Sequence, residues 1–220
     1  MLHMNDITKE FPDAVTEVAA SNAKPKGKGR FASAQPVLEK LFDLYPKLFG
    51  ARFLPLKLGI FQELMAAHPE VFKRDELKTA LGVHTRSTRY LQCVAAGLKR
   101  HDLQGNPGED VAPEHVFLSV VELFARRQAR TEEDLLPKLQ NQLASVYEKS
   151  GLTRADYLAR IGTPSEPVAA VLDQAVAQVD LQRARRTALL KAFEASGKTV
   201  AEFADSLGMP EREVQAVLTR

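Results

Sequence analysis

The 220 residues suffice for one large domain or two small ones, and a hydrophobic fraction of 45% is ordinary for a globular protein. A net charge of +2 excludes a uniformly basic nucleic-acid binder, so any such role must rest on local clusters of positive charge. The single cysteine, Cys93, excludes an intrachain disulfide and a cysteine-based metal cluster, and it suits a reducing cytosol. The first residues lack the apolar core of a signal peptide, and no stretch approaches the ~18 apolar residues of a membrane helix. We therefore expect a cytoplasmic protein.

Residues 1–32 are expected to form a flexible basic N-terminal tail. Within them, residues 21–30 mix lysine with glycine and proline and show no apolar periodicity, so they cannot bury a core. The lysines suit transient contact with phosphate, and a plain solubilising tail explains them equally well.

From residue 36 the apolar residues recur at three- and four-residue spacing, which predicts a series of helices. Lys57 lies at the expected start of the second helix, where the helix dipole disfavours a cation, and this cost suggests that an anion is supplied from outside. The turn-forming residues of 104–107 predict a short β-hairpin or extended ribbon, with Lys99 and Arg100 on its entry side. The helices are expected over about 36–44, 56–67, 74–81, 87–96 and 113–130.

The stretch 79–91 carries the clearest indication of a binding site. A helix is expected to begin at Thr85 or Ser87, whose hydroxyl can cap the first turn, and Arg89 and Tyr90 lie in or beside that turn. A helix N-terminus with free amides and nearby arginines can bind an anion, and a tyrosine beside it can stack on a base. An ordinary capped helix with a solvated basic side explains the same residues.

Three motifs resemble the ProQ/FinO family of RNA chaperones: PLKLGIFQ at 55–62, TRSTRYL at 85–91 and RHDLQGNP at 100–107. The similarity covers about residues 36–130. It implies a mainly α, elongated domain with a small β-hairpin and a concave basic face, which we place at residues 33–132. It also implies recognition of structured RNA, especially a stem-loop such as a terminator hairpin with a single-stranded 3′ tail. Bacterial members pair small regulatory RNAs with messages, which is post-transcriptional regulation, or protect RNA 3′ ends.

The resemblance also implies which residues contact RNA. The basic residues of the three motifs and of the third helix match the family's basic positions, and the hydroxyl residues at the helix start resemble its 3′-end pocket. With their neighbours, the predicted RNA-binding residues are Lys57, Arg74, Lys78, His84, Thr85, Arg86, Ser87, Thr88, Arg89, Tyr90, Lys99 and Arg100.

The chain departs from the family at several of these positions. Gly82, His84 and Thr88 stand where members often have arginine, tyrosine and tryptophan. Val121 stands at a basic position of the following helix, although Arg126 follows about one turn later. These changes bear on affinity and RNA preference rather than on the fold.

Residues 133–220 match themselves at an offset of about 46. Residues 150–157 face 196–203, and residues 162–164 face 208–210. Each copy is expected to consist of a helix, a Ser-Gly break, a short helix, a Gly-x-Pro turn and a final helix. The second copy has the spacing of a helix-turn-helix. We therefore expect two helix-turn-helix-like repeats after the first domain.

The sequence favours an RNA chaperone that is not an enzyme. The histidines show no paired metal-ligand spacing, and no nucleophile motif accompanies them, so we expect no cofactor and no metal. Two alternatives use the repeats. One is a DNA-binding regulator, although Glu211 and Glu213 on the would-be reading helix repel phosphate. The other is a protein-interaction scaffold, with the repeats serving self-association or docking to the first domain.

Overall fold

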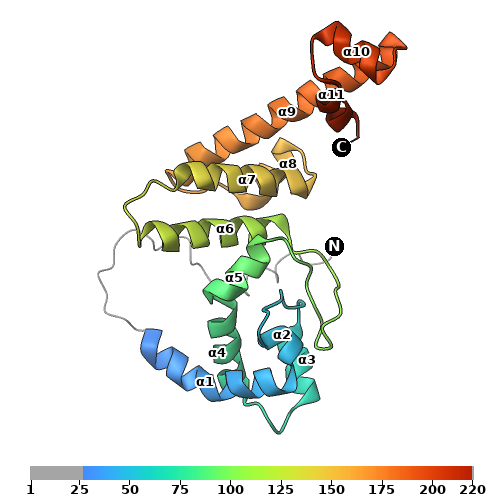
Figure 1. The fold of residues 1–220 in the computed structure, drawn as a ribbon. Helices are drawn as coiled ribbons and strands as arrows, with labels where there is room; N and C mark the ends of the chain where they lie inside the picture. Colours follow the sequence, from blue (N-terminus) through green and yellow to red (C-terminus); the bar gives the residue numbers. More distant parts are fainter. Residues whose placement is uncertain (1–26, 220) are drawn as a thin grey trace, which may run out of the picture.

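The computed structural model describes residues 27–219, which form eleven α-helices and no strand. Figure 1 shows an elongated arrangement, with α1–α5 at one end and α10 and α11 at the other. The expected mainly α-helical fold is confirmed. Within the described residues, no helix is both long and apolar enough to cross a bilayer. The first six helices are α1 Gly27–Leu44, α2 Pro46–Phe49, α3 Ile60–Ala67, α4 Arg74–Thr85, α5 Thr88–Ala95 and α6 Pro113–Gln128.

The first helix is longer than the sequence indicates. Residues 1–26 of the expected tail lie outside the described residues, but residues 27–32 belong to α1 rather than to a flexible segment. Ala34, Val37 and Leu41 are buried where α1 packs on α4. Once this packed face has formed a helix, each further residue adds one hydrogen bond at little cost, so the helix extends over a stretch of poor propensity.

A first apolar core joins α1–α5 to the loop that precedes α3. The most completely buried residues come from four helices. They lie on the apolar faces of these helices, and the three- and four-residue spacing of the sequence predicts such faces. They include Leu41, Leu48, Leu64, Leu77 and Ala80, each 0% exposed.

The expected β-hairpin is a turn without strands. The amide of Arg100 donates to Glu109 O (2.8 Å), and the amide of Gly108 donates to Arg100 O (2.7 Å). Between them, the Asp102 carboxylate accepts from the Gln104 and Asn106 amides. The Asp102 carboxylate thus binds backbone amides that would otherwise donate across a longer pair of strands. Only two isolated β-bridges remain among the described residues.

The second half contains α7 Leu136–Ser150, α8 Arg154–Ile161, α9 Val168–Ser196, α10 Val200–Leu207 and α11 Glu211–Leu218. The repeat is visible in the helix bounds, because α8 and α10 begin at 154 and 200 and end at 161 and 207, a difference of 46 at each end. The long helix α9 belongs to both copies: its first part closes copy 1, and its last part opens copy 2. We use copy 1 for α7, α8 and the start of α9, and copy 2 for the end of α9, α10 and α11.

The two copies share local chemistry as well as bounds. Thr153 and Thr199 cap α8 and α10, and Gly151 and Gly197 end the preceding helices with φ of 65° and 59°. These left-handed conformations favour glycine, which explains the two Ser-Gly breaks. Each copy also packs an aromatic pair between its first two helices, with ring centroids 5.0 Å apart for Tyr147–Tyr157 and 5.3 Å apart for Phe193–Phe203.

Candidate nucleic-acid interface

The interface centres on the capped start of α5. Ser87 has extended backbone angles, and its hydroxyl oxygen accepts from the Tyr90 amide at 3.2 Å. Thr85 does not share this role, because α4 extends through it and its hydroxyl donates to Leu81 O (2.9 Å). The amides of Thr88 and Arg89 have no acceptor among the residues that the structure describes. The start of α5 therefore offers two free donors at the positive end of the helix dipole.

One residue, Leu56, links the three motifs of the sequence. Its amide donates to the Tyr90 hydroxyl at 3.0 Å, and its carbonyl accepts from Arg100 Nη1 at 2.9 Å. On either side of Leu56, the backbone of His101 makes two further hydrogen bonds. Its amide donates to Pro55 O (2.7 Å), and its carbonyl accepts from the Lys57 amide (2.9 Å). Residues far apart in the chain are thus held around a short extended segment that leads into α3.

Arg100 is largely enclosed by the protein. It is 9% exposed, and besides Leu56 O it donates through Nη2 to His115 Nδ1 at 3.1 Å. A guanidinium has no acceptor, so His115 accepts here through an unprotonated nitrogen. Burial and the charge of Arg100 both lower the pKa of His115. Arg100 therefore fixes the segment around Leu56, and only a small part of its side chain is exposed.

An aromatic cluster lies under the start of α5. The His84 ring is 4.8 Å from Phe49, 4.4 Å from Phe53 and 5.3 Å from Tyr90, measured between ring centroids. His84 is 4% exposed, and burial lowers its pKa to about 4. Tyr90 is 8% exposed, which leaves little of its ring for the base that we expected it to contact. Both residues form the wall of the site rather than its charged surface.

Arg89 is the exposed cation of this cluster. Its guanidinium carbon lies 5.7 Å from the centroid of the Phe53 ring, an arrangement in which the ring face attracts the charge. The ring restrains a long side chain that would otherwise sample many conformations. An exposed cation on the first turn of α5 is therefore partly preorganised.

The remaining predicted residues lie farther out. Arg74 and Lys78 are exposed on the first turns of α4, and Arg74 stacks 5.6 Å from Phe61. Ten residues of helix, about 15 Å at 1.5 Å per residue, separate Arg74 from His84. These two cations therefore form a separate basic patch.

Lys57 and Lys99 are exposed on the loops, but each faces a carboxylate. Lys57 pairs with Glu63, a hydrogen bond that raises the pKa of Lys57, and Lys99 lies 3.9 Å from Asp110. Lys57 stands ahead of α3 rather than inside its first turn, since that helix begins at Ile60. A phosphate at either lysine competes with the neighbouring acid.

Arg126, which was not among the predicted site residues, also contacts the start of α5. Its Nη1 donates to Arg86 O (3.0 Å) and to the Thr88 hydroxyl (3.3 Å), and its Nε pairs with Glu122 at 2.7 Å. Although Arg126 belongs to α6, its guanidinium places a positive charge beside the first turn of α5. Its place in the chain, about one turn beyond the family's basic position at Val121, was the only sequence signal for it.

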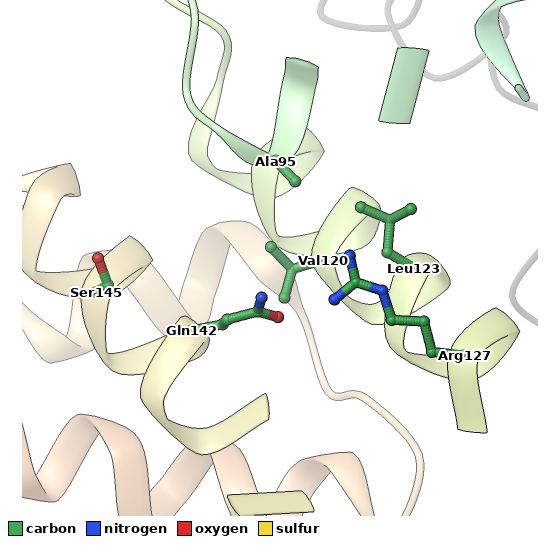
Figure 2. Close-up of a pocket in the computed structure, with 6 residues that line it drawn as sticks. All are labelled: Ala95, Val120, Leu123, Arg127, Gln142 and Ser145. Atoms are coloured by element: carbon green, nitrogen blue, oxygen red, sulfur yellow. The ribbon is translucent and has the colours of Figure 1, made fainter. Parts of the chain in front are cut away.

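Two hollows flank this region. Figure 2 shows the smaller, of about 130 Å³, beyond the far end of α5, where Arg127 lies beside Val120 and Leu123 and the Gln142 amide faces it from α7. It is below the size of typical ligand pockets. The larger, about 570 Å³, shares Phe53 with the aromatic cluster, and its volume lies within the range of small-ligand sites. Its lining is Arg52, Phe53, Leu54, Leu98, Lys99, His101 and Pro107.

Comparison with known proteins bears directly on this region. The model of the ProQ/FINO family matches residues 31–135, which contain all the interface residues described above. The RNA chaperone ProQ of Shewanella amazonensis is 35% identical over 91 residues, which are 40% of this chain and 42% of that protein. The RNA chaperone ProQ of Aeromonas salmonicida is 30% identical over 163 residues, 69% of this chain and 74% of that protein.

Among solved structures, a FinO-like RNA chaperone of Neisseria meningitidis is 32% identical with a TM-score of 0.36 and covers 40% of this chain and 90% of its own. The match to the family model and the extended similarity to the Aeromonas protein carry the assignment. The chain belongs to the ProQ/FinO family.

Proposed function

We propose that this chain is an RNA chaperone whose residues 33–132 bind a stem-loop with a single-stranded 3′ tail. In this proposal it acts in the bacterial cytoplasm, in post-transcriptional regulation by small RNAs. The observation that supports it most strongly is the arrangement around Leu56. There, Lys57, Tyr90 and Arg100 from three separate motifs meet beside the capped start of α5.

The proposed mechanism divides the work between a phosphate-binding surface and an end-binding site. Arg89, Lys57 and the outer patch of Arg74 and Lys78 neutralise phosphates of the A-form stem, which gives salt-dependent and largely shape-based affinity. The free amides of Thr88 and Arg89 hold the terminal nucleotide. Tyr90 and His84 support this turn from behind. Strand annealing then proceeds on binding energy alone.

The end-binding site predicts discrimination between RNA 3′ ends. A tailed stem-loop with a free 3′-hydroxyl is expected to bind best, because the two amides accommodate a compact group. A 3′-phosphate is expected to be too bulky for the end-binding site, and a complementary strand that converts the tail into duplex is expected to misplace the stem against Lys57. Either change should weaken binding by roughly 1–3 kcal/mol. Fluorescence anisotropy with the three RNAs at one salt concentration measures this. Equal affinities would mean that the protein reads the stem alone.

The structure also predicts different effects for its two central arginines. Arg89→Ala removes an exposed phosphate contact, so RNA affinity should fall by about 1 kcal/mol and the salt dependence by about one unit of slope, with unchanged stability. Arg100→Ala leaves the carbonyl of Leu56 without its buried donor, so it should also lower the free energy of unfolding by about 1.5–3 kcal/mol.

The matched control is Arg160→Ala, which removes an exposed arginine of copy 1. It should leave both RNA affinity and stability unchanged. Urea denaturation and anisotropy titrations separate the two arginine effects. An Arg89→Ala protein that binds RNA with the wild-type affinity and salt dependence would remove Arg89 from the interface.

A further inference from the structure

Arg126 uses only part of its guanidinium to join α6 to the start of α5. Its Nη1 donates to Arg86 O at 3.0 Å and to the Thr88 hydroxyl at 3.3 Å. Its Nε donates to the Glu122 carboxylate, one turn earlier on α6, at 2.7 Å. These acceptors occupy the N–H group of Nε and both N–H groups of Nη1. The N–H groups of Nη2 have no acceptor among the described residues.

The helix that carries Arg126 is fixed on two sides. It packs on α5 and on α7, and its residues Phe117, Val120 and Leu123 are buried. The contacts to α5 and to Glu122 then hold the Arg126 side chain in one place before any ligand arrives. A side chain that is already ordered loses little conformational entropy when it binds a further oxygen. The free Nη2 is therefore a preorganised donor beside the first turn of α5.

The charges around this donor favour an anion. Arg86 and Arg89 are exposed at the same turn, where the amides of Thr88 and Arg89 also lack an acceptor within the described part of the chain. Glu122 is the acid that contacts the guanidinium, and it meets Nε rather than Nη2. Three arginines and one carboxylate therefore lie at this turn. A guanidinium N–H binds a phosphate oxygen through a strong, charge-assisted hydrogen bond.

We propose that Arg126 binds the single-stranded 3′ tail of the RNA, with Nη2 donating to the phosphate that joins the terminal nucleotide to the preceding one. This inference rests on the proposed function, in which the amides of Thr88 and Arg89 hold the terminal nucleotide. The Thr88 hydroxyl is bonded to Nη1, so the guanidinium lies next to the residue that supplies one of these amides. The stem contacts proposed above come instead from α4 and from the loop before α3. Arg126 therefore contributes to recognition of the tail rather than of the stem.

Arg127 provides a matched control on the same helix. It is exposed and carries the same charge, but its side chain lies at the smaller hollow beyond the far end of α5, beside Val120 and Leu123 (Figure 2). Removing either arginine lowers the net charge of the protein equally. A difference between the two variants therefore reports the position of the charge and not its loss.

The test uses full-length proteins and two RNAs, a stem-loop with a single-stranded 3′ tail and the same stem-loop without the tail. Arg126→Gln is expected to bind the tailed RNA about tenfold more weakly than the wild type does, the effect of losing one charge-assisted hydrogen bond. Removing the tail should then have little further effect on this variant, because the two changes remove the same contact. Arg127→Gln should weaken binding of both RNAs by one small factor and retain the full preference for the tail. Anisotropy titrations measure all these affinities.

The salt dependence separates a phosphate contact from a contact that only holds the turn. For the tailed RNA, Arg126→Gln should lower the slope of log affinity against log salt concentration by about 0.7, the value for one phosphate of a single strand. An unchanged slope would mean that Arg126 only fixes the start of α5, and it would overturn the proposal. Thr88→Val, which removes the hydroxyl that accepts from Nη1, should reduce the preference for the tail several-fold.

The outcomes also distinguish this contact from the proposed function. A wild-type protein that binds both RNAs equally would overturn recognition of the tail as a whole, and with it the contact assigned to Arg126. A wild type that prefers the tailed RNA, together with Arg126→Gln and Thr88→Val proteins that show the same preference, would overturn the Arg126 contact alone. Circular dichroism of each variant verifies that the helices are intact.

Discussion

Replacing Tyr157 with alanine is expected to lower the free energy of unfolding by about 3–5 kcal/mol, as for other large buried aromatics. Tyr157 is 0% exposed and lies in the core to which α6, α7, α8 and α9 all contribute. Its ring packs at a tilt against Tyr147, another side chain with no exposed surface. Because the surrounding residues come from four helices that are fixed by other contacts, they cannot collapse far into the cavity. Urea denaturation followed by circular dichroism measures the loss.

The conservative variant Tyr157→Phe is expected to behave in the opposite way. The Tyr157 hydroxyl is buried without a hydrogen-bond partner among the described residues, and burial raises its pKa to about 12. Copy 2 carries Phe203 at the equivalent position, in the same ring pairing. Removing the hydroxyl should therefore leave stability unchanged or raise it by up to about 1 kcal/mol. A marked loss in Tyr157→Phe would show that the hydroxyl is hydrogen-bonded after all.

Acid is expected to destabilise this protein through His84. Burial lowers the pKa of His84 to about 4, whereas an unfolded histidine titrates near 6.5. Between these values the unfolded chain binds a proton that the folded chain excludes, so stability falls as pH decreases from about 6.5 to about 4. The difference corresponds to about 3 kcal/mol, which is fully present above pH 6.5. Protonation would place a charge among Phe49, Phe53 and Tyr90, with no counter-charge described beside it.

The variant His84→Phe isolates this effect from the other titrating groups. Phenylalanine retains a ring in the aromatic cluster but cannot be protonated. The free energy of unfolding should therefore be compared for both proteins at pH 7 and pH 4. The wild type should lose about 3 kcal/mol more than the variant over this range. Parallel pH profiles would show that His84 already escapes protonation in the unfolded chain or accepts it in the folded one.

The sequence alone determined the features whose causes are local. A hydroxyl cap at Thr85 or Ser87, the breaks after Ser150 and Ser196, and a short helix after each break depend on residues within a few positions of each other. Apolar periodicity likewise predicted the buried face of each helix, because burial repeats with the helical period. Three motifs in order were sufficient to identify the family.

Helix lengths were predicted less well, because packing overrides propensity. The helix α4 continues through Gly82 to Thr85, since Leu81 and His84 are buried on its inner face. The helix α1 begins at Gly27, in a stretch with no apolar periodicity. The expected hairpin contains no strand, because the Asp102 side chain organises the turn from within.

Only the tertiary structure decided which cations face outward and which are enclosed. Arg89 and Arg100 look alike in the sequence, yet Arg89 is exposed over Phe53 and Arg100 is committed to the carbonyl of Leu56. Leu56 meets Tyr90 and Arg100 from 34 and 44 residues away, and Arg126 reaches Arg86 from 40 residues away. Such contacts leave no periodic trace in the chain, because the positions of whole helices set them. Local patterns specify each helix and its apolar face, whereas the packing of those faces chooses the partner of every polar group between them.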